Sequence, residues 1–542
     1  MLPQAGGQPH SARYELGLVL GSALYLYLNL FTLTGTPMLL GGDQVFYWTY
    51  AQRLFHGELI YRDFFQITPP GTDLLYLGAF QLFGPRIWVP NLVVLVLGIG
   101  LCWLCFRVGR SIMKPTYAAL GAALFTIFFY GRMLNGTHHA FSVFAVMAAL
   151  AVVMEGTTAM RLALAGALLG IASFFTQTTG LFVALGIAVS LFCRQFRAAA
   201  AAAASAGGPA GTGAGAGTGA GAGTGAGAPA GASTPAGAST PGWGTLRPQA
   251  LLWLPLGLTW LTLSGYFIAR VGLRQLLYFQ VAYVRDYMVS GRDGLSLGFS
   301  EAVTWIGQPS GSEHLLVYAA LPCLYAVSLW RCRNGPEGPA AADSGRVALL
   351  AMAGAATFIA VAQHPNWLRA YYAAIPAVIL LVWLLSAGTG KLARYAVPLL
   401  SIGLTGLAVH QTWSRHHQPL VLQDLPAGRV ATAPPNAEKL AWLAGHTLPG
   451  QYFFQAGWPG VYLPLALRNP VFLDELDTSY QTPRSYVELS VQQLEAKHVQ
   501  YILWSPRLES LAYPFAPVRQ LLTDRYQRVW RFSDQDEIWQ RK

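Results

Sequence analysis

Charged residues are scarce in this chain. Only 11% of its 542 residues are Asp, Glu, Lys or Arg, against about 25% in an average soluble domain. Hydrophobic residues make up 54% of the chain, and many apolar runs approach the length of about 20 residues that a membrane-spanning helix requires. These proportions exclude an ordinary soluble protein and predict a mainly α-helical bundle that crosses a membrane.

The apolar runs predict about eleven membrane spans. The first run follows a polar start with little positive charge and precedes no small-residue cleavage site, so we expect a retained helix rather than a removed signal peptide. The clearest runs are 16–33, 87–108, 251–269, 315–330 and 371–386.

Cysteine is also rare, with five residues in the whole chain. All five lie within or beside apolar runs and none lies in the polar C-terminal part, which excludes a disulfide framework there. Cys102 and Cys105 have C-x-x-C spacing. Within an unbroken apolar helix, however, we expect them to be packing residues rather than a redox or metal pair.

The net charge of +11 does not indicate binding to DNA or RNA, because the basic residues form small clusters between apolar runs. These clusters follow the even-numbered spans, at 107–114, 194–197, 331–346 and 391–394. By the positive-inside rule, this alternation predicts a cytoplasmic N-terminus and, after an odd number of spans, a C-terminal part on the outer side. We therefore expect a multi-pass protein of a bacterial inner membrane with a periplasmic C-terminal domain.

Composition divides the chain into four parts. Residues 1–197 form a first transmembrane part, whose first outer loop is 41–86. The segment 198–242 is almost wholly Ala, Gly, Thr and Pro, which predicts a disordered cytoplasmic linker because such side chains bury too little apolar surface to order it. The segment 243–410 is a second transmembrane part.

Two further outer segments have mixed composition. In the outer loop 270–313, basic and acidic residues alternate with Leu, Tyr, Phe and Val, as in an interfacial amphipathic helix. Residues 411–542 read as a small periplasmic α/β domain. In that domain, periodicity predicts helices at 436–444 and 485–497 and strands at 451–455 and 499–504.

The first outer loop carries the most distinctive motif. Asp43 follows the first span, and residues 61–71 read YRDFFQITPPG. This arrangement resembles the GT-C superfamily of glycosyltransferases, in the branch of the protein O-mannosyltransferases and lipid A aminoarabinose transferases, whose first outer loop begins with an acid and ends in Pro-Pro. Segments 177–180 and 369–372 give weaker support, and the resemblance extends to about residue 386.

The resemblance implies an enzyme without a cofactor that moves a sugar from a polyprenyl-phosphate donor to an acceptor on the periplasmic side. Such transfer needs a base for the acceptor hydroxyl and a cation for the leaving phosphate. The matching acid in the family is the base, so this role is expected of Asp43, with capping of a helix at 45–55 as the alternative. In relatives, the position of Asp63 lies near the site; its alternative role is an ion pair with Arg62.

The phosphate-binding cation is less defined by the motif. Thr68 stands where aminoarabinose transferases have a lysine. Arginines near the outer membrane surface are therefore the candidates, either as phosphate ligands or as interfacial anchors. They are Arg369 and Arg270, which we favour, and Arg274 and Arg285.

Other residues are expected in the wall of the site. Adjacent histidines on a helix project about 100° apart and seldom share a metal, so we expect no metal site at His138 and His139. A site wall or acceptor contact is one interpretation of this pair, and simple solvent exposure is favoured over it. The expected wall residues are Tyr61, Pro69, Pro70, His138, His139 and His364.

Competing functions are a transporter or flippase, a non-catalytic membrane scaffold and another polysaccharide-assembly protein. Transporters place ionisable residues at mid-depth within their spans. Here the apolar runs hold almost no Asp, Glu, Lys or Arg, and polar residues gather in the outer loops. This distribution favours chemistry at the membrane surface, with membrane lipids as the surroundings, and leaves the sugar and the acceptor open.

Overall fold

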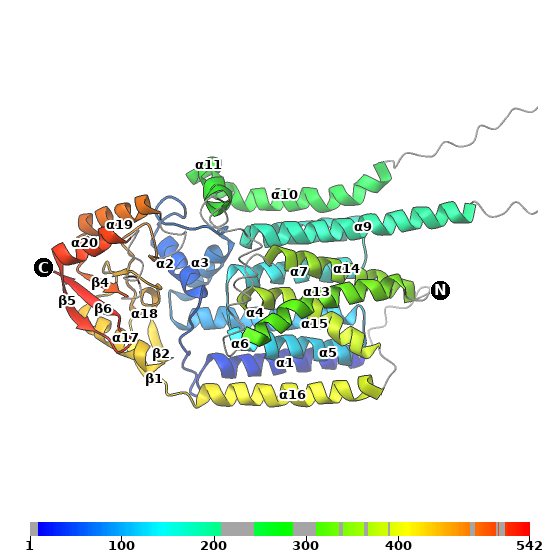
Figure 1. The fold of residues 1–542 in the computed structure, drawn as a ribbon, viewed down its shortest axis with the longest axis horizontal. Coiled ribbons are helices and arrows are strands. Elements are labelled where there is room, and N and C mark those ends of the chain that lie inside the picture. The colour runs from blue at the N-terminus through cyan, green and yellow to red at the C-terminus, as the bar shows by residue number, and fades with distance from the viewer. Residues whose placement is uncertain are drawn as a thin grey trace, which may run out of the picture.

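The computed structural model has two parts, a long helical bundle and a small α/β domain at one end of it (Figure 1). This is the architecture that the sequence predicts. The structure describes residues 9–206, 243–285, 311–334, 340–361, 367–387, 391–476, 483–505, 508 and 515–542.

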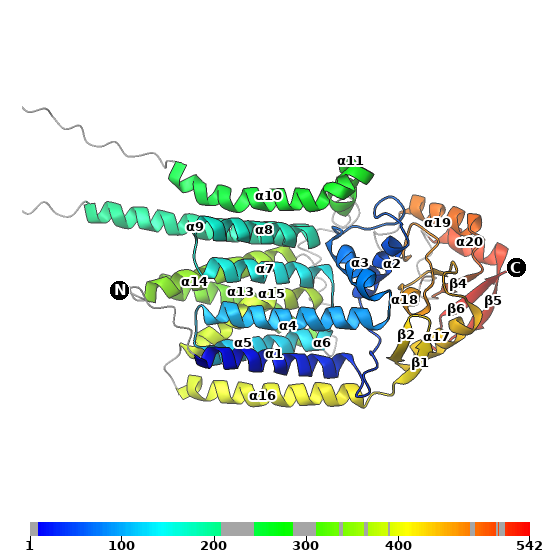
Figure 2. The same cartoon turned by 180° about the vertical axis from the view of Figure 1, so that it is seen from behind.

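The described part of the bundle contains eleven long helical stretches that run side by side (Figures 1 and 2). Their number matches the expected number of spans. Five of them are both long and apolar enough to cross a membrane by length and composition. The stretches are α1 (Pro9–Leu30), α4 (Trp88–Arg110), α5 (Pro115–Leu124) continued by η1 (Phe125–Tyr130) and α6 (Gly131–Met133), α7 (His138–Met154), α8 (Ala159–Phe175), α9 (Gln177–Ala206), α10 (Trp243–Val271), α13 (Gly311–Arg333), α14 (Ala340–Val361), α15 (Trp367–Ser386) and α16 (Lys391–His416).

The outer surface of the bundle is apolar. Leu16, Leu20 and Leu24 of α1 are each at least 60% exposed, and Leu254 and Leu258 of α10 are similarly exposed. Large apolar side chains repeated along a helix face in this way would be unfavourable in water but suit a hydrocarbon surrounding. The bundle is therefore a polytopic membrane unit.

Helix α9 is longer than expected. The sequence predicts a disordered linker from residue 198, whereas α9 continues to Ala206. The physical reason is the run of alanines at 198–204, because alanine has the highest intrinsic helix propensity and extends a helix that is already nucleated. The rest of the expected linker, 207–242, lies outside the described residues.

The first outer loop folds into two helices, α2 (Gln44–Phe55) and α3 (Gly71–Phe83), at the end of the bundle that faces the C-terminal domain (Figure 2). Helix α3 begins directly after Pro69 and Pro70. A Cβ atom on Gly71 would lie 2.7 Å from the carbonyl oxygen of Phe174. Glycine at this position therefore lets the start of α3 approach the end of α8.

The second outer segment is only partly described. It begins with α11 (Leu273–Leu277) and the π-helical turn η2 (Tyr278–Ala282). Leu273, Leu277 and Val281 are exposed, while Leu276 and Phe279 are buried. This division into two faces is the amphipathic pattern expected for the start of this loop, and residues 286–310 lie outside the described part.

The C-terminal domain has a hairpin and a four-stranded sheet. The sheet order is β3-β4-β6-β5, with β3 parallel to β4 and the other pairs antiparallel. The elements are β1 (Val421–Leu425), β2 (Gly428–Thr432), α17 (Pro434–His446), β3 (Phe454–Gln455), α18 (Tyr462–Leu465), α19 (Arg484–Ala496), β4 (Tyr501–Trp504), α20 (Ala516–Arg525), β5 (Tyr526–Arg531) and β6 (Glu537–Arg541). The helices expected at 436–444 and 485–497 correspond to α17 and α19. The strands expected at 451–455 and 499–504 correspond to the shorter β3 and β4.

Backbone hydrogen bonds join this domain to the first outer loop. The amide of Leu39 donates to the carbonyl of Ala431 at 2.8 Å, and the amide of Phe65 donates to the carbonyl of Phe472 at 2.8 Å. The Arg53 guanidinium on α2 contacts the Asp474 carboxylate at 2.8 Å, and both side chains are at least 95% buried. The loop and the domain therefore form one packed unit above the end of the bundle.

Candidate active site

Asp43 lies at the turn between the segment that follows α1 and the start of α2. The preceding Gly42 has φ +77°, a conformation that glycine adopts without strain. Asp43 occupies the N-cap position of α2, but its side chain makes no cap hydrogen bond. Capping therefore does not account for the acid, and its half-buried carboxylate is available for another role.

Arg369, near the start of α15, is the cation that the structure brings to Asp43. Burial raises the pKa of the Asp43 carboxyl above its ordinary value, and the positive charge of Arg369 partly offsets that rise. The same charge also acts on Tyr47, His138 and His139. Asp43, Tyr47, His138 and His139 are therefore grouped around the charge of Arg369 at the end of the bundle, and we call this group the centre.

The two histidines lie at the N-terminus of α7. His139 is 8% exposed, so the favoured expectation of simple solvent exposure is wrong for this residue, whereas His138 is half-buried. The Tyr47 hydroxyl is hydrogen-bonded to Nδ1 of His138. The centroids of the His138 and His139 rings lie 3.9 Å apart. The physical reason for their burial is that α2 and the start of α15 fold over this loop, an arrangement that the spacing of residues does not encode.

Gln44 fixes the backbone around Asp43, a role that sequence reasoning missed. Its Nε2 donates to the carbonyl oxygens of Gly41 at 2.8 Å and Leu134 at 3.2 Å. Its Oε1 accepts from the amide of Gly136 at 3.0 Å. The segment that carries Asp43 is thereby tied to the loop before α7, and this places the acid against the histidines.

Tyr61 links the end of the first outer loop to the second outer segment. Its hydroxyl donates to the carbonyl of Thr68 at 2.6 Å and accepts from Nε2 of Gln280 at 2.9 Å. Its ring stacks on Phe279 with centroids 5.6 Å apart. Tyr61 thus holds the turn that leads to Pro69 and into α3.

Asp73 is a second acid near the centre that the sequence analysis did not single out. It is fully buried in the first turn of α3, where burial raises the pKa of its carboxyl well above the ordinary value. Oδ2 accepts from Gln66 at 3.3 Å, and Oδ1 has no hydrogen-bond partner among the described residues. A charged residue two positions after Pro-Pro-Gly at the start of an apolar helix is the signal that could have identified it.

Asp63 has a different environment from Asp43. Its carboxylate accepts from the Arg62 guanidinium at 2.6 and 2.9 Å and from the amide of Leu59 at 2.8 Å. The hydrogen bonds from Arg62 hold the pKa of Asp63 below its ordinary value. These contacts agree with the ion-pair interpretation of Asp63, which orders the loop.

The remaining candidate arginines are exposed. The Arg270 guanidinium lies over the ring of Tyr266, 5.9 Å from its centroid, and Arg274 and Arg285 are also exposed. Of the four arginines, Arg369 is the one whose charge acts on Asp43. His364 lies outside the described residues. No three His, Cys, Asp or Glu side chains within the described ranges gather as metal ligands.

No protein-family model and no curated protein sequence matches this chain. Solved structures do match it. ArnT from Cupriavidus metallidurans bound to undecaprenyl phosphate aligns with a TM-score of 0.59 and 12% identity over 97% of this chain and 97% of ArnT. The same protein in the apo state aligns with a TM-score of 0.54 and 13% identity over 98% of each chain.

The archaeal oligosaccharyltransferase AglB from Archaeoglobus fulgidus, in complex with an inhibitory peptide and a dolichol-phosphate, aligns with a TM-score of 0.46 and 13% identity. That alignment covers 96% of this chain and 73% of AglB. The two alignments with ArnT span both the helical bundle and the C-terminal domain. They show that the chain has the GT-C fold that the first outer loop implied.

Proposed function

We propose that this chain, which has the GT-C fold, is a glycosyltransferase that moves a sugar from a polyprenyl-phosphate donor to an acceptor hydroxyl. The observation that carries the proposal is the half-buried carboxylate of Asp43 beside the positive charge of Arg369. The shared fold with ArnT, which binds undecaprenyl phosphate, supports a lipid-linked donor.

The two residues fit the two requirements of the reaction. The acceptor oxygen attacks the anomeric carbon of the donor while its proton passes to the Asp43 carboxylate. The bond between the anomeric carbon and the phosphate oxygen breaks, and its electron pair leaves with polyprenyl phosphate. The Arg369 guanidinium stabilises the negative charge on that phosphate through charge-assisted hydrogen bonds.

Other residues of the centre act by positioning. Gln44 holds the backbone beside Asp43, and Tyr47 orients the ring of His138. Asp73 has a raised pKa because of its complete burial. Asp73 has no exposed surface, so an acceptor hydroxyl does not reach its carboxyl, and this leaves the role of base to the half-buried Asp43.

We place the reaction on the periplasmic side of a bacterial inner membrane. Basic residues gather at the end of the bundle away from the C-terminal domain. Arg346 donates to the carbonyl of Ser111 at 3.2 Å, and Arg331 donates to the carbonyl of Ala387 at 3.1 Å, so the ends of four helices meet there. By the positive-inside rule this end is cytoplasmic, and Asp43 with the C-terminal domain is on the opposite side.

A donor panel tests the proposed function. Purified protein in lipid nanodiscs is incubated with radiolabelled polyprenyl-phosphate sugars, each with an extract of cell-envelope lipids and glycans as acceptors. We expect at least one donor to lose its sugar to an acceptor and to release polyprenyl phosphate. If none of the donors lost its label, the result would contradict a glycosyltransferase that uses a lipid-linked donor.

Arg369→Ala should raise the donor KM and move the acidic limb of the pH–rate profile to higher pH. The positive charge of Arg369 lowers the pKa of Asp43, so its removal raises that pKa and the base is protonated at a higher pH. Arg369→Lys keeps the charge and should leave the acidic limb near its wild-type position. An unchanged limb in Arg369→Ala would show that the two residues are not coupled.

A further inference from the structure

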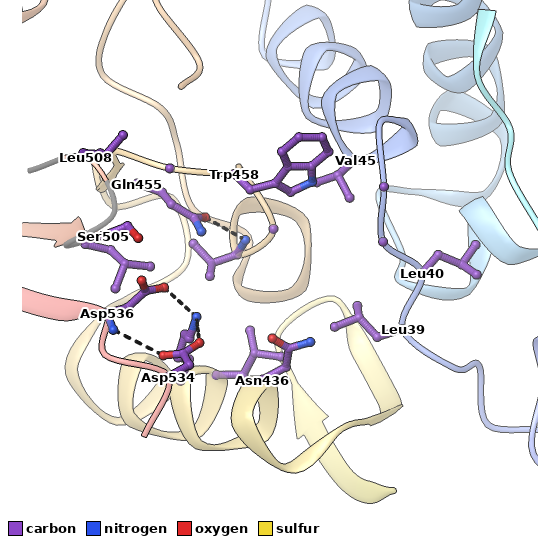
Figure 3. Close-up of a pocket in the computed structure, with 18 residues that line it drawn as sticks. Leu39, Leu40, Val45, Asn436, Gln455, Trp458, Ser505, Leu508, Asp534 and Asp536 are labelled. Atoms are coloured by element: carbon purple, nitrogen blue, oxygen red, sulfur yellow. Dashed lines mark hydrogen bonds and ion pairs between the residues drawn. The ribbon is translucent and has the colours of Figure 1, made fainter. Parts of the chain in front are cut away.

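A cavity of about 430 Å³ lies between part of the first outer loop and the C-terminal domain (Figure 3). Gly41, Gly42 and Val45 form one wall, so the cavity reaches the residue before Asp43 and the first turn of α2. The opposite wall comes from α17 and from the turn between β5 and β6. The volume is within the range of pockets that hold a small ligand.

The cavity carries hydrogen-bonding groups that the protein does not use. Oε1 of Gln455 accepts from the amide of Val461 at 3.2 Å, which fixes the side chain. Its Nε2, the exposed side-chain amide of Asn436 and the half-buried hydroxyl of Ser505 also line the cavity and make no hydrogen bond to a described residue. A ligand rich in hydroxyl groups would satisfy these donors and acceptors, because each hydroxyl both donates and accepts.

Trp458 supplies a flat apolar surface at the same place. It is 44% exposed, and Figure 3 shows its indole beside Val45 at the edge of the cavity. The ring contacts Phe46 of α2 edge-on, with centroids 4.8 Å apart and an interplanar angle of 71°. An indole that is fixed in this way can stack on the apolar C–H face of a sugar ring while polar neighbours bind its hydroxyls.

The charges of the described lining residues give a preference among ligands. Lys439 forms ion pairs with Asp534 and, at 2.6 Å, with Asp536. One positive and two negative charges leave one negative charge on this wall. The turn that holds the two aspartates is fixed to α17, since the hydroxyl of Ser533 donates to Glu438 at 2.6 Å. An anionic ligand would therefore meet repulsion that an uncharged one avoids.

We infer that this cavity binds an uncharged saccharide unit, with Trp458 as the stacking surface and Asn436, Gln455 and Ser505 as hydroxyl contacts. Resting on the proposed function, this saccharide belongs to the acceptor, because the cavity wall includes Gly42, which adjoins the proposed base. The enzyme would then transfer its sugar to a neutral glycan rather than to a phosphorylated one.

The test is binding, measured without any transfer. Full-length protein in nanodiscs free of glycoside detergents is studied by saturation-transfer-difference NMR with maltose, cellobiose and α-mannobiose, and with glucose 6-phosphate and glucuronic acid as anionic probes. We expect at least one neutral disaccharide to bind and Trp458→Ala to weaken its binding at least tenfold. Trp530→Ala is the matched control, because Trp530 is 46% exposed in the same domain and does not line the cavity.

Three outcomes would overturn the inference: binding of none of the neutral disaccharides, equal binding by Trp458→Ala and wild type, or tighter binding of the anionic probes. A folding defect is recognised by comparison with Trp458→Phe, which keeps an aromatic surface and should retain part of the binding. The donor panel separates the two proposals. Donor turnover without saccharide binding would contradict only the inference that the cavity binds a saccharide. Saccharide binding without turnover of any donor would contradict the proposed glycosyltransferase activity.

Discussion

Asp43→Asn should lower the rate of sugar transfer by about 10² to 10⁴, the usual effect of losing a general base. Asn has the size of Asp but cannot accept the acceptor's proton. The wild-type side chain makes no cap hydrogen bond to α2, so the substitution removes no such contact. Expression, membrane insertion and donor binding should therefore stay close to wild type, and turnover at saturating donor is the measurement.

Asp63→Asn is the control for this result. Asp63 is in the same loop, but its carboxylate is occupied by Arg62 and by the amide of Leu59. We expect a milder loss, through a less ordered loop. If Asp43→Asn kept more than about a tenth of wild-type turnover, the loss would be smaller than the least expected of a general base, and Asp43 would not have that role.

Of the substitutions proposed for this protein, Arg53→Met should cause the largest loss of folding stability. It leaves the Asp474 carboxylate buried without its cation, and breaking a buried ion pair typically costs about 3–5 kcal/mol. Arg53 and Asp474 are 5% and 1% exposed, and their contact joins α2 to the C-terminal domain. The measurement is the thermal unfolding midpoint of the purified protein, which should fall, together with faster proteolysis of the domain.

Two further variants test whether this loss of stability comes from the buried ion pair. Arg53→Met combined with Asp474→Leu should recover part of the stability, because the fully buried carboxylate is removed together with its cation. Glu58, which also pairs with Arg53 at 2.7 Å, still has Arg468 at 3.6 Å. Arg429→Met removes an exposed pair with Asp424 and should leave the midpoint unchanged. A midpoint equal to wild type in Arg53→Met would show that this pair does not hold the domain to the loop.

The bundle and the C-terminal domain could be predicted from the sequence because their signals are local. Apolar runs determine the spans, and helical periodicity located α17 and α19 within a few residues. The β5–β6 hairpin was not predicted, because neither YQRVWR of β5 nor EIWQR of β6 alternates apolar with polar residues, and five of the six residues of β5 are exposed. The length of α9 depended on helix propensity, which the linker composition obscured.

The site could be predicted only in part. The motif identified Asp43 and the turn around Tyr61, since these residues are close in sequence. The motif favoured Arg369 together with Arg270, and the separation of the two required tertiary structure, because only the fold shows that the charge of Arg369 acts on Asp43. The burial of His139 and of Asp73 also results from tertiary packing, so it could not be predicted from the neighbouring residues in the sequence.

The anomeric configuration of the transferred sugar tests the central claim most directly. A single displacement, in which Asp43 takes the proton and phosphate leaves from the opposite face, inverts the configuration at the anomeric carbon. NMR of the product formed from a donor of known configuration by the wild-type protein should show inversion, and Asp43→Asn should form almost none of that product. Retained configuration, or equal product from Asp43→Asn, would contradict the account.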